Sequence, residues 1–139
     1  MALHMPEPRT AKRRIALVFF DAGGGHRNAA TALQAEIESK GLPFETSLVN
    51  LQEILDSLDV FRKLTGIRMQ DMYNRMLRNG WTLGSPQLMR VLQLIVRVYH
   101  RQTVDALVQF WQTTQPGMVV SLVPHFNRAL KESFEKAFP

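Results

Sequence analysis

The sequence feature that most constrains the fold is a run of three glycines, Gly23–Gly25, between an apolar segment and a segment with helical periodicity. The residues before it, Ile15–Phe20, are apolar without interruption, which is typical of a strand buried on both faces of a parallel sheet. After it, apolar residues recur every four positions, as on one face of a helix: Ala29, Leu33 and Ile37. The sequence therefore predicts a strand over 14–20, a helix over 28–40 and a glycine turn that joins them.

The rest of the chain continues the alternation of strands and helices. Gly41 and Pro43 end the first helix, a second strand is predicted over 44–49, and a further buried strand is predicted over 118–123. Helices are predicted in the long middle and at the end: from 52, over 67–78, from 86 with a bend near His100, and over 127–138. This order predicts an α/β fold with a Rossmann-like parallel sheet and flanking helices.

The chain of 139 residues has the size of one domain, and 45% hydrophobic residues suffice for a core. We expect a disordered basic tail over 1–13, the domain over 14–139 and a helical segment over about 51–115 within it. In parallel sheets, ligands bind at the carboxyl ends of the strands. The residues that follow the first and last strands, Asp21–His26 and Pro124–Asn127, are therefore predicted to meet at one edge.

The glycine turn has the composition of a diphosphate-binding loop at a helix N-terminus. Glycines let backbone N–H groups approach a phosphate, and a basic residue follows them. The predicted binding residues are Gly23, Gly24, Gly25, Arg27, Asn28, His125 and Asn127. The segment is neither a Walker loop nor a G-x-G-x-x-G motif, and a tight turn that binds nothing fits the same residues equally well.

His26 directly follows the glycines and is the candidate catalytic residue. A neutral imidazole there could accept a proton from a substrate hydroxyl, a role typically worth about 10²–10⁴ in rate. For a lone histidine the commoner role is to cap a helix or fill space. The four histidines are scattered and the chain has no cysteine, so we expect no metal site and no disulfide.

The middle of the chain is strongly basic, with eight Lys or Arg and one Asp between Val60 and Val104. Such a stretch favours an anionic partner. The residues predicted to contact a membrane surface are Arg68, Arg75, Arg78, Trp81, Arg90 and Arg97. The alternative is ordinary helices with core faces and solvated arginines. No apolar run approaches the ~20 residues of a membrane span, and no apolar core of a secretory signal is present, which favours a cytoplasmic location.

The segment "FFDAGGGHRNAATAL" resembles the amino-terminal motif of monogalactosyldiacylglycerol synthases and processive diacylglycerol glucosyltransferases, relatives of the peptidoglycan glycosyltransferase MurG. The resemblance implies the amino-terminal, acceptor-binding half of a GT-B fold, with the helical segment as a membrane-facing insertion. It implies that His26 is the base on the acceptor hydroxyl and that Gly23–Gly25 lie near the donor diphosphate. In "VVSLVPHFNRAL", His125 follows the proline, whereas the family has a histidine before it.

The implied activity is transfer of a hexose from UDP-galactose or UDP-glucose to diacylglycerol, by an enzyme peripheral on the cytoplasmic face of a membrane. The UDP-sugar would be held mostly by a carboxyl-terminal domain that these residues do not contain, so we expect the isolated chain to be inactive. The alternative is a non-enzymatic α/β module that binds a phosphate-bearing ligand or a protein partner. A nucleic-acid partner is not expected, because the few aromatic residues form no stacking platform and no helix-turn-helix spacing is present.

Overall fold

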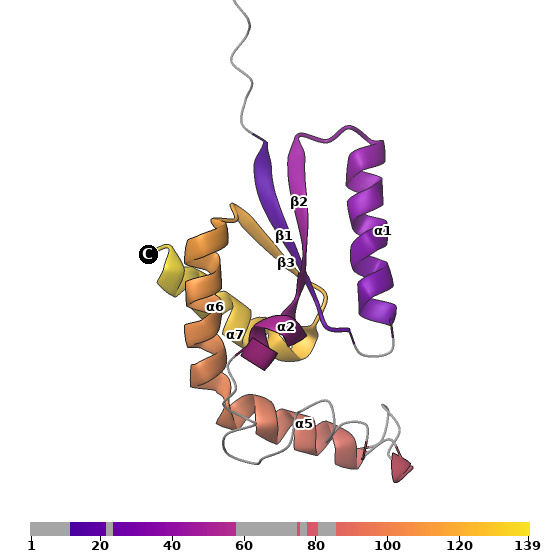
Figure 1. Cartoon of the computed structure of the whole chain (residues 1–139), viewed down its shortest axis with the longest axis vertical. Helices are drawn as coiled ribbons and strands as arrows, with labels where there is room; N and C mark the ends of the chain where they lie inside the picture. Colours follow the sequence, from indigo (N-terminus) through magenta and orange to yellow (C-terminus); the bar gives the residue numbers. More distant parts are fainter. Residues whose placement is uncertain (1–11, 22–23, 58–74, 76–77, 81–85) are drawn as a thin grey trace, which may run out of the picture.

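The computed structural model describes residues 12–21, 24–57, 75, 78–80 and 86–139. Its centre is a three-stranded parallel sheet with the order β2-β1-β3 (Figure 1). The strands are β1 (Arg13–Phe19), β2 (Phe44–Asn50) and β3 (Met118–Ser121). This arrangement confirms the predicted α/β class and the parallel sheet with flanking helices.

Helices cover both faces of this sheet. The helices of the described chain are α1 (Gly25–Ser39), α2 (Leu51–Ser57), α5 (Pro86–Val98), α6 (His100–Thr114), the short 3-10 helix η1 (Pro124–Phe126) and α7 (Asn127–Ala137). The helix α1 lies on one face, and α6 and α7 lie on the other (Figure 1). The middle of the chain therefore crosses from the edge strand β2 to the opposite edge strand β3.

The alternating side chains of β1 supply two separate cores. Leu17 and its neighbours on the same face pack with Ala30 of α1, whereas Val18 and its neighbours pack with Leu107 and Trp111 of α6. All five residues Ile15–Phe19 are buried. The central position of β1 explains why the sequence there has no polar residue, since neither face meets water.

The ends of α1 show how its glycines set the helix boundaries. The helix begins at Gly25, three residues before the predicted start, because Gly24 adopts a left-handed conformation (φ 77°) and takes the N-cap position. At the other end Gly41 (φ 59°) donates its N–H to Glu38 O at 3.0 Å, and Leu42 donates to Ile37 O at 3.2 Å. This pair of bonds is a Schellman motif, and it confirms the predicted glycine terminator.

Two other predicted boundaries differ from the structure. The chain from residue 86 changes direction near His100, as expected, but it forms two helices instead of one bent helix: α5 and α6 meet at Tyr99 (φ −93°, ψ 10°) at a large angle (Figure 1). The last strand ends at Ser121 instead of residue 123, where the Ser121 hydroxyl accepts a hydrogen bond from Val123 N at 3.2 Å and turns the chain. The segment 67–78 and the tail 1–13 lie mostly outside the described residues.

Candidate functional site

The carboxyl ends of β1 and β3 lie side by side at one edge of the sheet, as expected. The connection after β1 leads to one neighbouring strand and the connection after β2 leads to the other, so this edge holds a topological switch point. The two chain segments that follow β1 and β3 also touch. The rings of Phe20 and Phe126 stack with centroids 6.2 Å apart and an interplanar angle of 9°.

The glycine turn leads from this edge directly into the N-terminus of α1. The N-cap residue Gly24 has no side chain to cap this helix end, no described side chain caps it, and its first turn contains no acidic residue. The first hydrogen bond runs from Asn28 N to Gly24 O at 3.0 Å, so the preceding N–H groups have no acceptor within the helix. Apart from Gly25, its two neighbours and the backbone of α1, no described atom lies within 4 Å of the position of a Cβ on Gly25, which leaves the turn open on that side. Gly23 lies outside the described residues.

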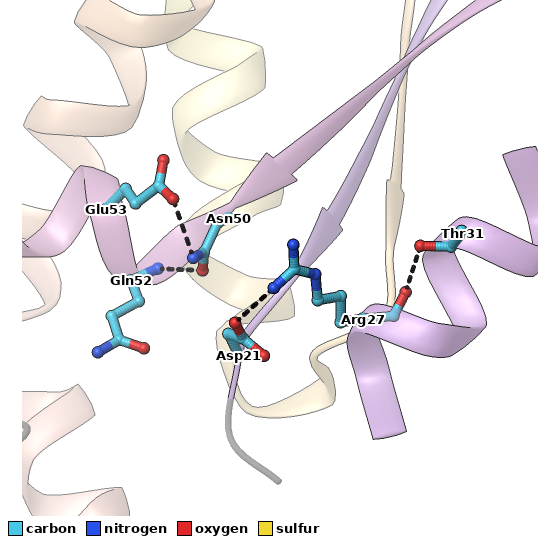
Figure 2. A network of polar contacts seen from close by, with 6 residues as sticks. All are labelled: Asp21, Arg27, Thr31, Asn50, Gln52 and Glu53. Carbon is cyan, nitrogen blue, oxygen red and sulfur yellow. Dashed lines mark hydrogen bonds and ion pairs between the residues drawn. The ribbon is translucent and has the colours of Figure 1, made fainter. Parts of the chain in front are cut away.

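An ion pair spans the glycine turn. Arg27 Nη1 lies 3.2 Å from Asp21 Oδ2, and the two side chains point toward each other across the strand-to-helix connection (Figure 2). Both side chains remain in contact with solvent, with exposed fractions of 61% and 35%. Asp21 was not among the predicted site residues, although an acid and a base that flank a glycine run are a visible signal. Its carboxylate offsets part of the positive charge at this helix end.

His26 is exposed in the first turn of α1. Among the residues that the structure describes, no side chain forms a hydrogen bond or ion pair with its imidazole. A catalytic histidine is commonly oriented by a carboxylate or a backbone carbonyl, and none of the described groups takes that position. Asn28 is likewise exposed. The geometry leaves His26 accessible to a ligand at the sheet edge without fixing its ring.

The end of β2 adds polar side chains that sequence reasoning missed. Asn50 Oδ1 accepts a hydrogen bond from Gln52 N at 3.2 Å, and Asn50 Nδ2 donates to Glu53 Oε1 at 3.3 Å (Figure 2). The two bonds cap the start of α2. These two bonds account for the polar side chain of Asn50 without a ligand.

His125 and Asn127 follow β3, but they take different positions. His125 lies in η1 and lines a cavity of about 570 Å³ together with Arg97, Arg101 and Arg128. None of the described residues of the glycine turn lines this cavity. Asn127 is exposed at the start of α7. The predicted binding residues are thus divided between the glycine turn and a separate basic cavity.

Four of the residues predicted to contact a membrane are described, and all are exposed: Arg75, Arg78, Arg90 and Arg97. Arg68 and Trp81 lie outside the described residues. On α5 the arginines alternate with exposed apolar side chains, Leu94 at 59% and Val98 at 60%. None of the helices in the described part has the length and apolar content needed to cross a bilayer. Nor do three His, Asp or Glu side chains gather there as a metal site would require.

Comparisons with protein-family models, with curated proteins and with solved structures found no match to this chain. Any functional assignment therefore rests on the α/β architecture, on the geometry of the sheet edge and on the residues that surround it.

Proposed function

We propose that this chain is the acceptor-binding amino-terminal domain of a membrane-associated glycosyltransferase that moves a hexose from a UDP-sugar to diacylglycerol. In this proposal the sheet is the amino-terminal half of a GT-B fold, and a carboxyl-terminal domain holds most of the donor. His26 is the base on the acceptor hydroxyl, and the N–H groups of the glycine turn face the donor diphosphate.

The observation that carries the proposal is the placement of the glycine turn. It follows the central strand at the switch point of the sheet, where α/β proteins bind their ligands. The uncapped start of α1 offers N–H donors and a positive helix end to an anion. The exposed imidazole of His26 stands in the same turn, so a hydroxyl and a phosphate could be held within one small region.

The surface of α5 supports the membrane-associated part of the proposal. Leu94 and Val98 are four residues apart and therefore lie on the same side of the helix, where more than half of each side chain is exposed. Arg90 precedes them and Arg97 lies between them on the same helix, and both arginines are exposed as well. Exposed apolar residues among cations are typical of helices that lie on an anionic membrane surface.

The direct test is a transfer assay on the chain joined to the sequence that follows it in its gene, with labelled UDP-galactose or UDP-glucose and diacylglycerol. We expect His26→Ala to lower turnover by about 10²–10⁴, because a positioned general base contributes that much. Thr31→Ala is the matched control on the same helix, since its hydroxyl bonds to the backbone oxygen of Arg27. Turnover that is unchanged by His26→Ala would refute the role of the imidazole.

One observation favours the alternative, a non-enzymatic module that binds a phosphate-bearing ligand. Within the described chain, His26 has no partner that orients its ring, and Arg27 is engaged by Asp21. The same assay separates the two functions. Binding of UDP without sugar transfer by the joined protein would favour the module, whereas labelled glycolipid would establish the enzyme.

A further inference from the structure

A basic cavity of about 570 Å³ lies among α5, the start of α6, η1 and α7. Its basic side chains come from every one of these elements: Arg97, His100, Arg101, His125 and Arg128. Val96 and the buried Ala129 form apolar parts of its wall. Basic residues that precede β3 in the sequence and basic residues that follow it thus line the same cavity.

Glu132 offsets the charge of His100 at this cavity, but the three arginines have no such partner among the described residues. No Asp or Glu of the described chain lines it, and none forms an ion pair with Arg97, Arg101 or Arg128. Glu132 is the carboxylate next to it, and Glu132 is already held by His100 Nε2 at 2.7 Å and Lys136 Nζ at 2.9 Å. Three guanidinium groups around one space repel each other unless an anion joins them.

The identity of the cations points to the kind of anion. A guanidinium presents a planar fork of donors that matches the oxygens of a phosphate, and three such forks suit a group with several terminal oxygens. All three arginines are exposed, so their guanidinium groups are accessible to a phosphate. The volume is ample for a diphosphate or for the headgroup of a phospholipid.

We propose that this cavity binds a phosphate group through Arg97, Arg101 and Arg128, with His125 as a further hydrogen-bonding group. The phosphate belongs either to a small soluble molecule or to a phospholipid headgroup at the membrane surface. This site goes beyond the proposed function and does not depend on it, because no described residue of the glycine turn contributes to the cavity.

The first experiment titrates pyrophosphate into the whole chain by isothermal calorimetry. We expect the double variant Arg101→Gln/Arg128→Gln to weaken binding by about tenfold to hundredfold, since each lost contact is a hydrogen bond between charged groups. The control Lys40→Gln/Lys131→Gln removes the same charge from exposed positions paired with Glu36 and Glu135, and it should bind as the wild type does. Circular dichroism verifies that both variants are folded.

The second experiment measures sedimentation of the chain with phosphatidylcholine vesicles that contain or lack phosphatidic acid. The cavity variant is Arg101→Gln/Arg128→Gln. If it loses pyrophosphate binding but keeps phosphatidate-dependent sedimentation, the ligand is a soluble phosphate; if it loses only the sedimentation, the ligand is a lipid headgroup. If it loses both, the site holds either ligand. Equal losses in the cavity variant and the control, or wild-type binding by the cavity variant in both experiments, would overturn the proposal. So would a wild-type chain that binds neither probe.

Discussion

The indole of Trp111 and the hydroxyl of Ser133 form a fully buried hydrogen bond between α6 and α7. Trp111 Nε1 donates to Ser133 Oγ at 2.9 Å, and Ser133 Oγ donates in turn to Leu130 O at 3.0 Å. Both residues are 0% exposed. This bond holds together the two helices that carry Arg101 and Arg128, so its contribution to stability also concerns the basic cavity.

The substitution Ser133→Ala removes the acceptor and leaves the indole N–H buried without a partner. An unsatisfied buried donor costs about 1–3 kcal/mol. Alanine recovers roughly 0.5 kcal/mol because it is the better helix former in α7. We therefore expect the free energy of unfolding to fall by about 0.5–2.5 kcal/mol. In a Trp111→Phe background the donor is gone, and the same serine substitution should cost about 0.5 kcal/mol or less.

The wild type, Ser133→Ala, Trp111→Phe and the double variant form a double-mutant cycle and are compared by urea denaturation. Unfolding is followed by far-ultraviolet circular dichroism, because the fluorescence of the buried tryptophan is lost in the Trp111→Phe proteins. The expected coupling energy between Trp111 and Ser133 is about 1–2 kcal/mol. If Ser133→Ala costs the same in both backgrounds, the hydrogen bond makes no contribution of its own and the reasoning fails. If it costs nothing in the wild type, the buried N–H is satisfied in some other way.

Two further predictions concern the surface. The hydrogen bond from His100, and then that from Lys136, lower the pKa of Glu132 from 4.5 to about 2, so the stability that the carboxylate contributes is present above pH 4.5 and lost as pH falls toward 2. The difference in denaturation midpoint between the wild type and Glu132→Gln should therefore become smaller as pH falls from 4.5 toward 2. A difference that stays constant over this range would contradict a stabilising role of the carboxylate. Leu94→Gln should weaken sedimentation with anionic vesicles about tenfold, while Leu42→Gln, at another exposed leucine outside α5, should not; equal behaviour of the two would exclude an apolar membrane contact through α5.

The parts of the fold that depend on local patterns were predictable. An uninterrupted apolar strand has few places in a protein except the centre of a parallel sheet, and β1 occupies that place. Gly41 ends α1 because its positive φ suits glycine, and the sequence places it directly after the apolar periodicity. These predictions succeed because the residues of one short segment determine the structure of that segment.

The boundaries that depended on backbone choice were not predictable. Any of the three glycines could have taken the N-cap position in the left-handed conformation, and the choice of Gly24 put His26 and Arg27 inside the helix. The sequence indicates a bend near His100, but no proline or glycine there shows that it divides the segment into two helices, α5 and α6. Tertiary packing determines where α6 begins, because Val104, Leu107 and Trp111 hold this helix against the sheet.

The basic cavity shows the same limit for functional residues. Arg97 was predicted as a membrane contact and His125 as a ligand-binding residue beside the glycine turn, while Arg101 and Arg128 were not singled out. Only the turn at Tyr99 and the short helix η1 bring them around one space. The spacing of these residues in the sequence does not indicate that they line one cavity, because their proximity depends on how α5, α6 and α7 pack.

The two places that can receive an anion differ in how much of their charge is already balanced. At the glycine turn, a phosphate must compete with the Asp21 carboxylate for Arg27, so the backbone N–H groups are the main attraction left there. In the cavity, three arginines face the ligand space with no paired carboxylate among the described residues. A group of high negative charge is therefore better matched to the cavity. The glycine turn keeps its backbone N–H groups for a phosphate, and it adds a carboxylate acceptor and an exposed imidazole for a neutral hydroxyl, which is the group that the acceptor of a glycosyl transfer presents.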